Sequence, residues 1–278
     1  MKLARYWSRD AGVAGGIRVT ARGWSDESIE AARARAREIA RRVAERLSTQ
    51  AGPRDRYPYG DRPLPEPVLR EFAAAAVTRN AYGALVLNTA EMMFVDIDRQ
   101  DTQKSAGSLV SSLLSLFRKP AQEALPPAQS ASESDAIRRV AERHGFSARV
   151  YQTAAGYRVI ITGQTFRAGS SEAEAILKEF GADPVYVRLC RMQESFRARL
   201  TPKPWRCGFL NPPVQYPFET PQDEAKFQRW EADYTRRAAN WATCRFVSAA
   251  GGQVATGFAE LIAYHDQETK ATSGLQLA

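Results

Sequence analysis

The segment MMFVDID, at residues 92–98, constrains the fold of this chain more than any other stretch of the sequence. Its apolar run predicts a β-strand, in which successive side chains point to opposite faces. Asp96 and Asp98 therefore share one face, and the opposite face is apolar. Two carboxylates this close raise each other's pKa unless a cation lies nearby. The strand must present the pair to a metal ion, to an arginine or to water.

The elements expected around this strand alternate regularly. A hairpin through residues 82–98 is followed by a helix, two strands, a second helix and an extended segment. These are expected at residues 135–145, 147–153, 156–163, 170–181 and 184–202. The order over residues 82–201 is that of the split β-α-β arrangement. The predicted fold class is therefore α+β, with a ferredoxin-like or RRM-like antiparallel sheet core in which the aspartate strand lies centrally.

Flanking segments extend this core on both sides. Residues 1–60 predict an N-terminal strand-helix unit, with the strand at 17–24 and a helix that Ser25 or Asp26 begins. The core at residues 61–206 would open with a short helix, VLREFAAAAV. Residues 207–278 predict a Pro-rich wrap and a long C-terminal helix that begins at Thr220 and Pro221.

An insertion interrupts the predicted core near residues 101–134. Its second half is poor in large apolar residues and rich in Pro, Ser and Ala, so we expect it to be flexible. We expect the three parts of the chain to form one compact domain.

Arginines are expected to face the aspartate pair. Alternation in FRARL, residues 196–200, puts Arg197 and Arg199 on one face, and Arg158 is a third candidate. In a chemical interpretation, Asp96 and Asp98 bind Mg²⁺ or Mn²⁺ while the arginines hold the phosphates of a nucleotide. In a structural interpretation, the aspartates and arginines pair with each other across the sheet. Both interpretations stay open.

The VDID motif at residues 95–98 resembles the apolar-Asp-apolar-Asp motif of the archaeo-eukaryotic primase superfamily, whose catalytic core is RRM-like. The resemblance implies that Asp96 and Asp98 are catalytic and bind the metal. It also implies a third acid, for which Glu194 is the first candidate and Asp183 the second. The Arg-rich strand of the family corresponds to FRARL.

A departure from the family lies in the stretch TAAGYRVII, at residues 153–161. The family has a nucleotide-contacting histidine here, whereas this chain has Gly156, Tyr157 and Arg158. Tyr157 and Arg158, with Arg197 and Arg199, are therefore the candidates for binding nucleotide phosphates. The stretches TRNAYGALVLNT and RARLTPKPWRCG are also similar to those of a group of bacterial proteins that have no assigned activity.

The segment at residues 197–218 interleaves cations, aromatics and prolines. Aromatic rings stack on bases and cations meet phosphates, so Lys203, Trp205 and Arg206 are candidate nucleic-acid-binding residues. The alternative is a Pro-rich loop that wraps the core and buries Trp205.

Composition restricts the class of partner and the compartment. The net charge of +8 favours polyanionic partners such as nucleotides or nucleic acid. Three cysteines without a CxxC motif argue against a disulfide framework and for a reducing cytoplasm. The first residues lack the apolar core of a secretory signal, and no stretch approaches the ~20 apolar residues of a membrane span.

Two functions follow from these observations. The first is nucleotide or nucleic-acid handling by a divergent primase-polymerase-like nucleotidyltransferase that uses the aspartate pair and a divalent metal. The second is a non-catalytic module of the same fold that binds nucleic acid or protein, with the aspartates paired by Arg197 and Arg199. The sequence does not decide whether the protein is an enzyme.

Overall fold

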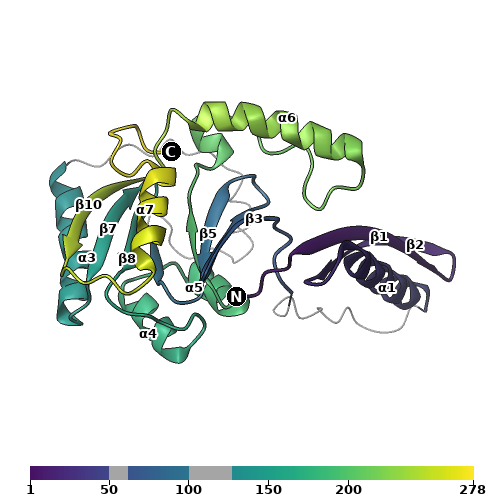
Figure 1. The fold of residues 1–278 in the computed structure, drawn as a ribbon, viewed down its shortest axis with the longest axis horizontal. Helices are drawn as coiled ribbons and strands as arrows, with labels where there is room; N and C mark the ends of the chain where they lie inside the picture. Colours follow the sequence, from purple (N-terminus) through teal and green to yellow (C-terminus); the bar gives the residue numbers. More distant parts are fainter. Residues whose placement is uncertain (50–61, 100–126) are drawn as a thin grey trace, which may run out of the picture.

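The computed structural model describes residues 1–49, 62–99 and 127–278. Helices surround two four-stranded antiparallel sheets, and a two-stranded hairpin with its own helix lies at one end of the molecule (Figure 1). The α+β class is thus confirmed. Among the described residues, no helix combines the length and apolar character that crossing a membrane requires.

The first sheet contains the aspartate strand at its edge. The strand order is β10 (Cys244–Ala250), β7 (Ala148–Thr153), β8 (Gly156–Ile161) and β6 (Phe94–Asp98). The β7–β8 hairpin was predicted and is confirmed. The central position expected for the aspartate strand is wrong, because β6 pairs only with β8 within this sheet. Helices α3 (Pro127–Arg143) and α7 (Phe258–Thr269) lie on opposite sides of the sheet (Figure 1).

The second sheet has the order β3 (Val68–Phe72), β4 (Ala75–Arg79), β5 (Leu85–Thr89) and β9 (Phe196–Arg199). The helix predicted for VLREFAAAAV is wrong, since β3 and β4 form a hairpin there. The hairpin predicted through residues 82–98 is also wrong, because β5 and β6 belong to different sheets. Buried Asn88 explains why β5 stays with β4: its side-chain amide donates to Ala76 O and to Thr78 Oγ1.

Two helices precede β9. Helix α4 (Ser171–Glu179) was predicted, and Ser170 caps it. Helix α5 (Pro184–Gln193) replaces the extended segment expected there. The β-branched residues of PVYVRLC favoured a strand, but Asp183 at the N-cap and Pro184 at the first helical position start a helix instead.

The N-terminal unit is a hairpin and a helix rather than a strand and a helix. It consists of β1 (Tyr6–Ala14), β2 (Ile17–Ser25) and α1 (Ile29–Ser48), and Ser28 provides the N-cap. Gly23 permits close packing, because a Cβ there would lie 2.2 Å from the carbonyl oxygen of Ala32. Four alanines of α1, at positions 32, 36, 40 and 44, are fully buried. The strand predicted at residues 17–24 is β2, and β1 is the strand of this unit that was not predicted.

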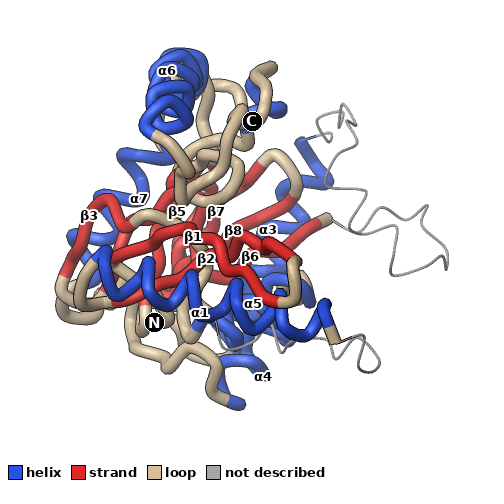
Figure 2. Tube along the Cα trace, turned by 90° about the vertical axis from the view of Figure 1, so that its right-hand side faces the viewer, coloured by secondary structure: helices blue, strands red, loops and turns tan. Residues whose placement is uncertain are grey.

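The C-terminal part does more than wrap the core. A 3-10 helix, η3 (Pro204–Cys207), precedes α6 (Pro221–Ala238), which Thr220 caps as predicted. The chain then adds β10 to the first sheet and ends beyond α7, while α6 projects above both sheets (Figure 2). Residues 100–126 of the predicted insertion lie outside the described residues, and helix α3 begins at Pro127.

Candidate functional site

The two sheets meet where β6 faces β9, and a single tyrosine joins these edges. Tyr186 of α5 donates its hydroxyl proton to the carbonyl oxygen of Phe94 at 2.8 Å. The same hydroxyl accepts from the backbone N–H of Arg197 at 3.3 Å. The backbone N–H of Asp183 donates to the carbonyl oxygen of Asp96 at 3.0 Å. This junction holds the aspartate pair.

Three carboxylates lie at the junction. Asp96 and Asp98 alternate along β6 as the strand pattern predicted. Asp183 caps α5, and its carboxylate accepts from the backbone N–H groups of Val185 and Tyr186. Desolvation, followed by the charges of Asp96 and Asp183, raises the pKa of Asp98, although that residue is exposed overall. The charges of Lys203 and Arg199 oppose this shift and do not cancel it.

Arg158 lies directly opposite Asp96 in the β6–β8 register. Its guanidinium Nη2 is 3.6 Å from Asp96 Oδ1, and its Nη1 donates to the carbonyl oxygen of Arg199 at 2.8 Å. Only 2% of the residue is exposed. Its Nε has no hydrogen-bond partner in the described part of the chain. Arg158, a candidate from the sequence, thus joins the site and links the two sheets.

His265 supports Arg158 from helix α7. Its Nε2 lies 3.3 Å from Arg158 Nη1, and its Nδ1 lies 3.0 Å from Asp266 Oδ1. Burial lowers the pKa of His265 to about 4, so the ring is neutral near pH 7. A neutral ring that donates from Nδ1 to Asp266 can accept from Arg158 at Nε2. Sequence reasoning missed this residue because it looked for a histidine on a strand.

The hydrogen-bond network continues away from the site. Asp266 Oδ2 accepts from Arg149 Nη2 at 2.6 Å, and Arg149 Nε donates to the hydroxyl oxygen of Tyr151 at 2.7 Å. Because each member has a charged or polar partner, the network holds the His265 ring in one orientation.

Three further cationic side chains, Arg199, Lys203 and Arg206, lie near the junction. Burial, followed by the charges of Arg199 and Arg206, lowers the pKa of Lys203 to about 8. Burial also lowers the pKa of Arg199, to which Arg158 and Arg206 contribute while Asp96 opposes them. The Nε of Arg199 has no hydrogen-bond partner among the described residues. The charges of Asp98 and Asp96 oppose the shift at Lys203 and do not cancel it.

Arg197 does not face the aspartates, so the predicted pairing by Arg197 is wrong. Its Nη2 lies 2.8 Å from both carboxylate oxygens of Glu66, and both side chains are buried. Thr78 also donates to this carboxylate. Arg197 and Glu66 thus form a buried ion pair that stabilises the second sheet.

Two other candidates also lie away from the junction. Glu194 ends α5 in the left-handed conformation, and its exposed carboxylate pairs with Lys2 at 3.3 Å. Tyr157 is buried on the face of β8 opposite to Arg158, with the Arg99 guanidinium 5.5 Å from its ring centroid. Of the two candidates for the third acid, the structure brings Asp183 and not Glu194 to the pair.

Trp205 and Arg206 follow Lys203 on η3. Trp205 is half-buried, its ring packs edge-on against Tyr82 at 5.1 Å, and Lys203 Nζ lies 5.4 Å from its centroid. Burial lowers the pKa of Arg206, and the charge of Asp98 opposes this shift. Lys203 and Arg206 therefore share the electrostatic environment of the aspartates.

The donor set restricts metal binding to the aspartate pair. No group of three or more His, Cys, Asp or Glu side chains that could hold a metal ion occurs within residues 1–49, 62–99 and 127–278. Asp183 uses both carboxylate oxygens to cap α5, whereas Asp96 and Asp98 lie on the same face of β6. Mg²⁺ commonly uses one or two protein carboxylates and takes its other ligands from substrate phosphates and water. The pair fits that kind of site.

Comparisons of the chain with protein-family models, with curated proteins and with solved structures found no match.

Proposed function

We propose that this protein binds the phosphates of a nucleotide or nucleic acid at the β6–β9 junction, with Mg²⁺ or Mn²⁺ held by Asp96 and Asp98. One observation carries the proposal: the pKa of Asp98 is raised while that of neighbouring Lys203 is lowered. Burial is the largest cause of both shifts, and the charges of Lys203 and Arg199 offset only part of the shift at Asp98. A cation beside Asp98 and an anion beside Lys203 would each favour the charged form. A metal ion with a phosphate supplies both.

The residues of the site then have distinct roles. Arg199, Lys203 and Arg206 bind phosphate oxygens, and arginine does so with its two-pronged guanidinium. Arg158, fixed by His265, keeps Asp96 in place. A bound metal ion would neutralise phosphate charge and activate a hydroxyl, which is the chemistry of nucleotidyl transfer.

A divergent primase-polymerase-like nucleotidyltransferase is the enzyme class that we propose. Its support is the VDID motif on β6 and the β7–β8 hairpin beside it. The edge position of β6 departs from the RRM-like strand order. We therefore base the proposed enzyme class on the residues of the site and not on a shared strand order.

A non-catalytic module that binds nucleic acid or protein is the second candidate. Two observations favour it: Arg158 already lies beside Asp96, and the hairpin has Gly156, Tyr157 and Arg158 where the family has its histidine. Such a module would bind phosphates with its cations and use the aspartates only to balance charge.

Calorimetric titration with Mn²⁺ and a nucleoside triphosphate tests the proposal. We expect metal-dependent binding by the wild type, and a ligand at 100 times its Kd should stabilise the fold by about 2.7 kcal/mol. Asp96→Asn/Asp98→Asn should lose the binding. Asp135→Asn/Asp233→Asn, which removes two exposed carboxylates elsewhere, should keep it.

The outcomes separate the two candidates. Incorporation of a labelled nucleotide by the wild type, lost in Asp96→Asn/Asp98→Asn, supports the enzyme. Phosphate binding without turnover supports the module. No metal-dependent binding, together with an aspartate variant less stable than the wild type, would contradict the metal site and leave the aspartates a structural role.

A further inference from the structure

The β1–β2 hairpin has two unlike faces. One face packs on α1, since a Cβ at Gly12 would lie 2.3 Å from the backbone nitrogen of Arg41. Alternation places Arg9, Arg22 and Arg18 on the other face. Val13, opposite Arg18 in the register, is 61% exposed. None of the described helices covers this outer face near the hairpin turn (Figure 1).

The arginines of the outer face have too few anionic partners. Arg9 and Arg22 lie directly opposite each other, an arrangement that destabilises a sheet when the charges are alike. Arg9 pairs with Glu219 at 2.6 Å, whereas neither Arg18 nor Arg22 has a hydrogen bond or ion pair with another described residue. Burial, followed by the charge of Arg9, lowers the pKa of Arg22. The charge of Glu219 opposes this shift at Arg22, so among the described residues three arginines share one carboxylate and the face keeps an excess of positive charge.

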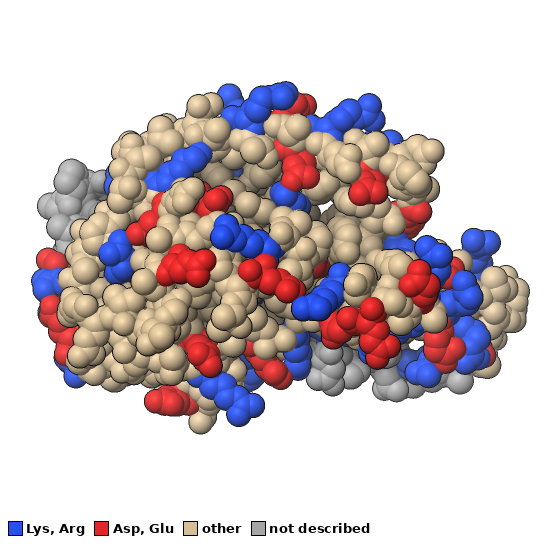
Figure 3. Space-filling view, in the orientation of Figure 1, with Lys and Arg blue, Asp and Glu red and all other residues tan. Residues whose placement is uncertain are grey.

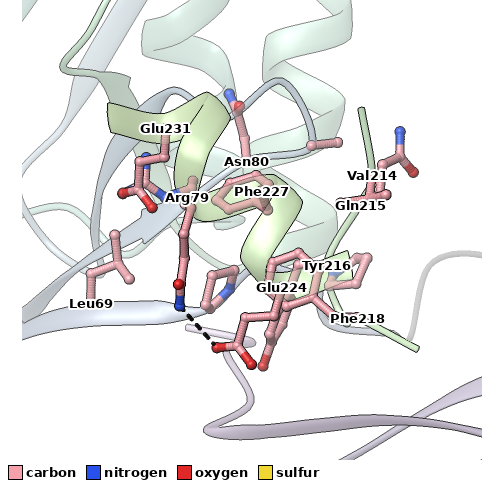
Figure 4. Close-up of a pocket in the computed structure, with 14 residues that line it drawn as sticks. Leu69, Arg79, Asn80, Val214, Gln215, Tyr216, Phe218, Glu224, Phe227 and Glu231 are labelled. Atoms are coloured by element: carbon pink, nitrogen blue, oxygen red, sulfur yellow. Dashed lines mark hydrogen bonds and ion pairs between the residues drawn. The ribbon is translucent and has the colours of Figure 1, made fainter. Parts of the chain in front are cut away.

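A pocket adjoins this face. Arg9 donates to the carbonyl oxygen of Gln215, and Gln215 lines a cavity of 220 Å³ between the start of β3, residues 214–218 and α6. Figure 4 shows the aromatic side chains of Tyr216, Phe218 and Phe227 around the cavity. Figure 3 shows basic side chains, interspersed with acidic ones, over the N-terminal unit. Cations and aromatic rings thus lie side by side.

We infer that this surface binds single-stranded nucleic acid, with phosphates on Arg18 and Arg22 and one base in the aromatic pocket. Sequence-tolerant single-strand binding combines a basic path for the backbone with aromatic rings on which bases stack. An acidic protein segment or an anionic membrane would use the arginines and would leave the aromatic pocket unused. The surface is separate from the Asp96 site, and the inference does not depend on that site.

Fluorescence anisotropy of a labelled single-stranded oligonucleotide at several salt concentrations tests the inference. Arg18→Gln/Arg22→Gln should bind more weakly, and its slope of log K against log salt should be shallower by about 1.4, since each phosphate contact on a single strand contributes about 0.7. Arg143→Gln/Arg236→Gln removes the same charge from exposed positions on α3 and α6 and should bind as the wild type does.

Phe218→Leu tests the pocket separately. Half-buried Phe218 lines the cavity, and leucine keeps the site apolar without a ring. We expect about tenfold weaker binding with an unchanged salt slope, because a stacking contact is lost and no phosphate contact. Thermal melting of each variant confirms that it is folded.

Three results would overturn the inference. One is wild-type affinity and slope in Arg18→Gln/Arg22→Gln. Another is that polyglutamate or anionic vesicles bind the wild type as tightly as the oligonucleotide does, and that the same variant abolishes this binding. That result would make the face a general anion surface. The third is loss of oligonucleotide binding in Asp96→Asn/Asp98→Asn but not in Arg18→Gln/Arg22→Gln. That result would assign the binding to the junction. Retention of binding in that aspartate variant supports a separate surface.

Discussion

Gly156 fixes the distance between β8 and the aspartate strand. It pairs with Asp98, and a Cβ at this position would lie 1.9 Å from the carbonyl oxygen of Ile97. Because the obstacle is backbone, Gly156→Ala should push β8 away from β6 and destabilise the fold by about 1–3 kcal/mol. Urea denaturation measures this change. Metal-dependent nucleotide binding should weaken as well.

Gly252→Ala is the matched control for that change. No heavy atom would lie within 4 Å of a Cβ at Gly252, so its free energy of unfolding should change by less than about 0.5 kcal/mol. Equal stability of the Gly156→Ala and Gly252→Ala proteins would show that β6 and β8 can separate without cost.

Lys203 should make phosphate binding depend on pH. With its pKa lowered to about 8, the ammonium is charged at pH 7 and largely neutral at pH 9. Affinity for inorganic triphosphate should therefore fall as the pH rises through 8. Lys203→Arg should keep its affinity over this range, since a guanidinium stays protonated. Titration calorimetry at pH 7, 8 and 9 gives the comparison, and an identical decline in both proteins would contradict the assignment.

The lowered pKa of Lys203 also makes the stability of the fold depend on pH. The pKa of Lys203 is lower in the folded chain than the ordinary value of 10.5. Between about pH 8 and 10.5 the unfolded chain therefore binds more protons than the folded chain does. The contribution of Lys203 thus makes the protein more stable as the pH rises through this window.

Local alternation was sufficient to find part of the site. Asp96 and Asp98 share a face because strand parity requires it, and this could be predicted from the sequence. Arg158 was only a candidate, because both faces of its strand are apolar and the register with β6 decides its position. The partner of Arg197 could not be predicted, because Glu66 lies 131 positions away along the chain. His265 reaches Arg158 from a helix 107 positions away, and only tertiary packing creates that contact.

At the scale of elements, Asp183 serves both helix α5 and the acidic cluster. Its carboxylate caps the helix, and its charge helps to raise the pKa of Asp98. Asp183→Ala should destabilise the fold by about 1 kcal/mol through loss of the cap, whereas Asp183→Asn should keep most of that stability. Both variants should lower the pKa of Asp98, which an NMR titration of its carboxyl carbon follows.

The two substitutions distinguish the roles of Asp183. Equal destabilisation by Asn and Ala would show that the charge matters more to the fold than the cap. An unchanged pKa of Asp98 in both variants would show that Asp183 is not part of the acidic cluster.

Elements with strong end signals were predicted better than those without them. Helices α4 and α6 were found because serine or threonine caps precede clear helical patterns. The β3–β4 hairpin was missed because its alanines favour helix, and burial in a sheet outweighs that weak preference. Strand β1 was missed because the alternation around Asp10 and Gly12 becomes meaningful only once α1 packs on them.

At the scale of the whole molecule, the site depends on how two separate sheets meet. The expected single sheet would have placed β9 beside β6 by backbone hydrogen bonds, whereas β9 pairs with β5. No local pattern in the sequence specifies to which of the two sheets each strand belongs. The approach of β6 to β9 is instead fixed by side chains from helices, above all by Tyr186 of α5 and by the His265 network of α7.

Tyr186→Phe should therefore weaken both the fold and the site. It removes the hydroxyl that accepts from the Arg197 N–H and donates to the Phe94 carbonyl, and it leaves both groups buried without that partner. We expect a loss of about 1–3 kcal/mol in the free energy of unfolding by urea. Tyr6→Phe, at a residue that is 39% exposed, should leave the free energy of unfolding unchanged.

If the junction positions Asp96 and Arg199, the folded Tyr186→Phe protein should also bind metal and nucleotide more weakly. A variant that loses stability but keeps wild-type affinity would show that the approach of the two sheets does not govern the site.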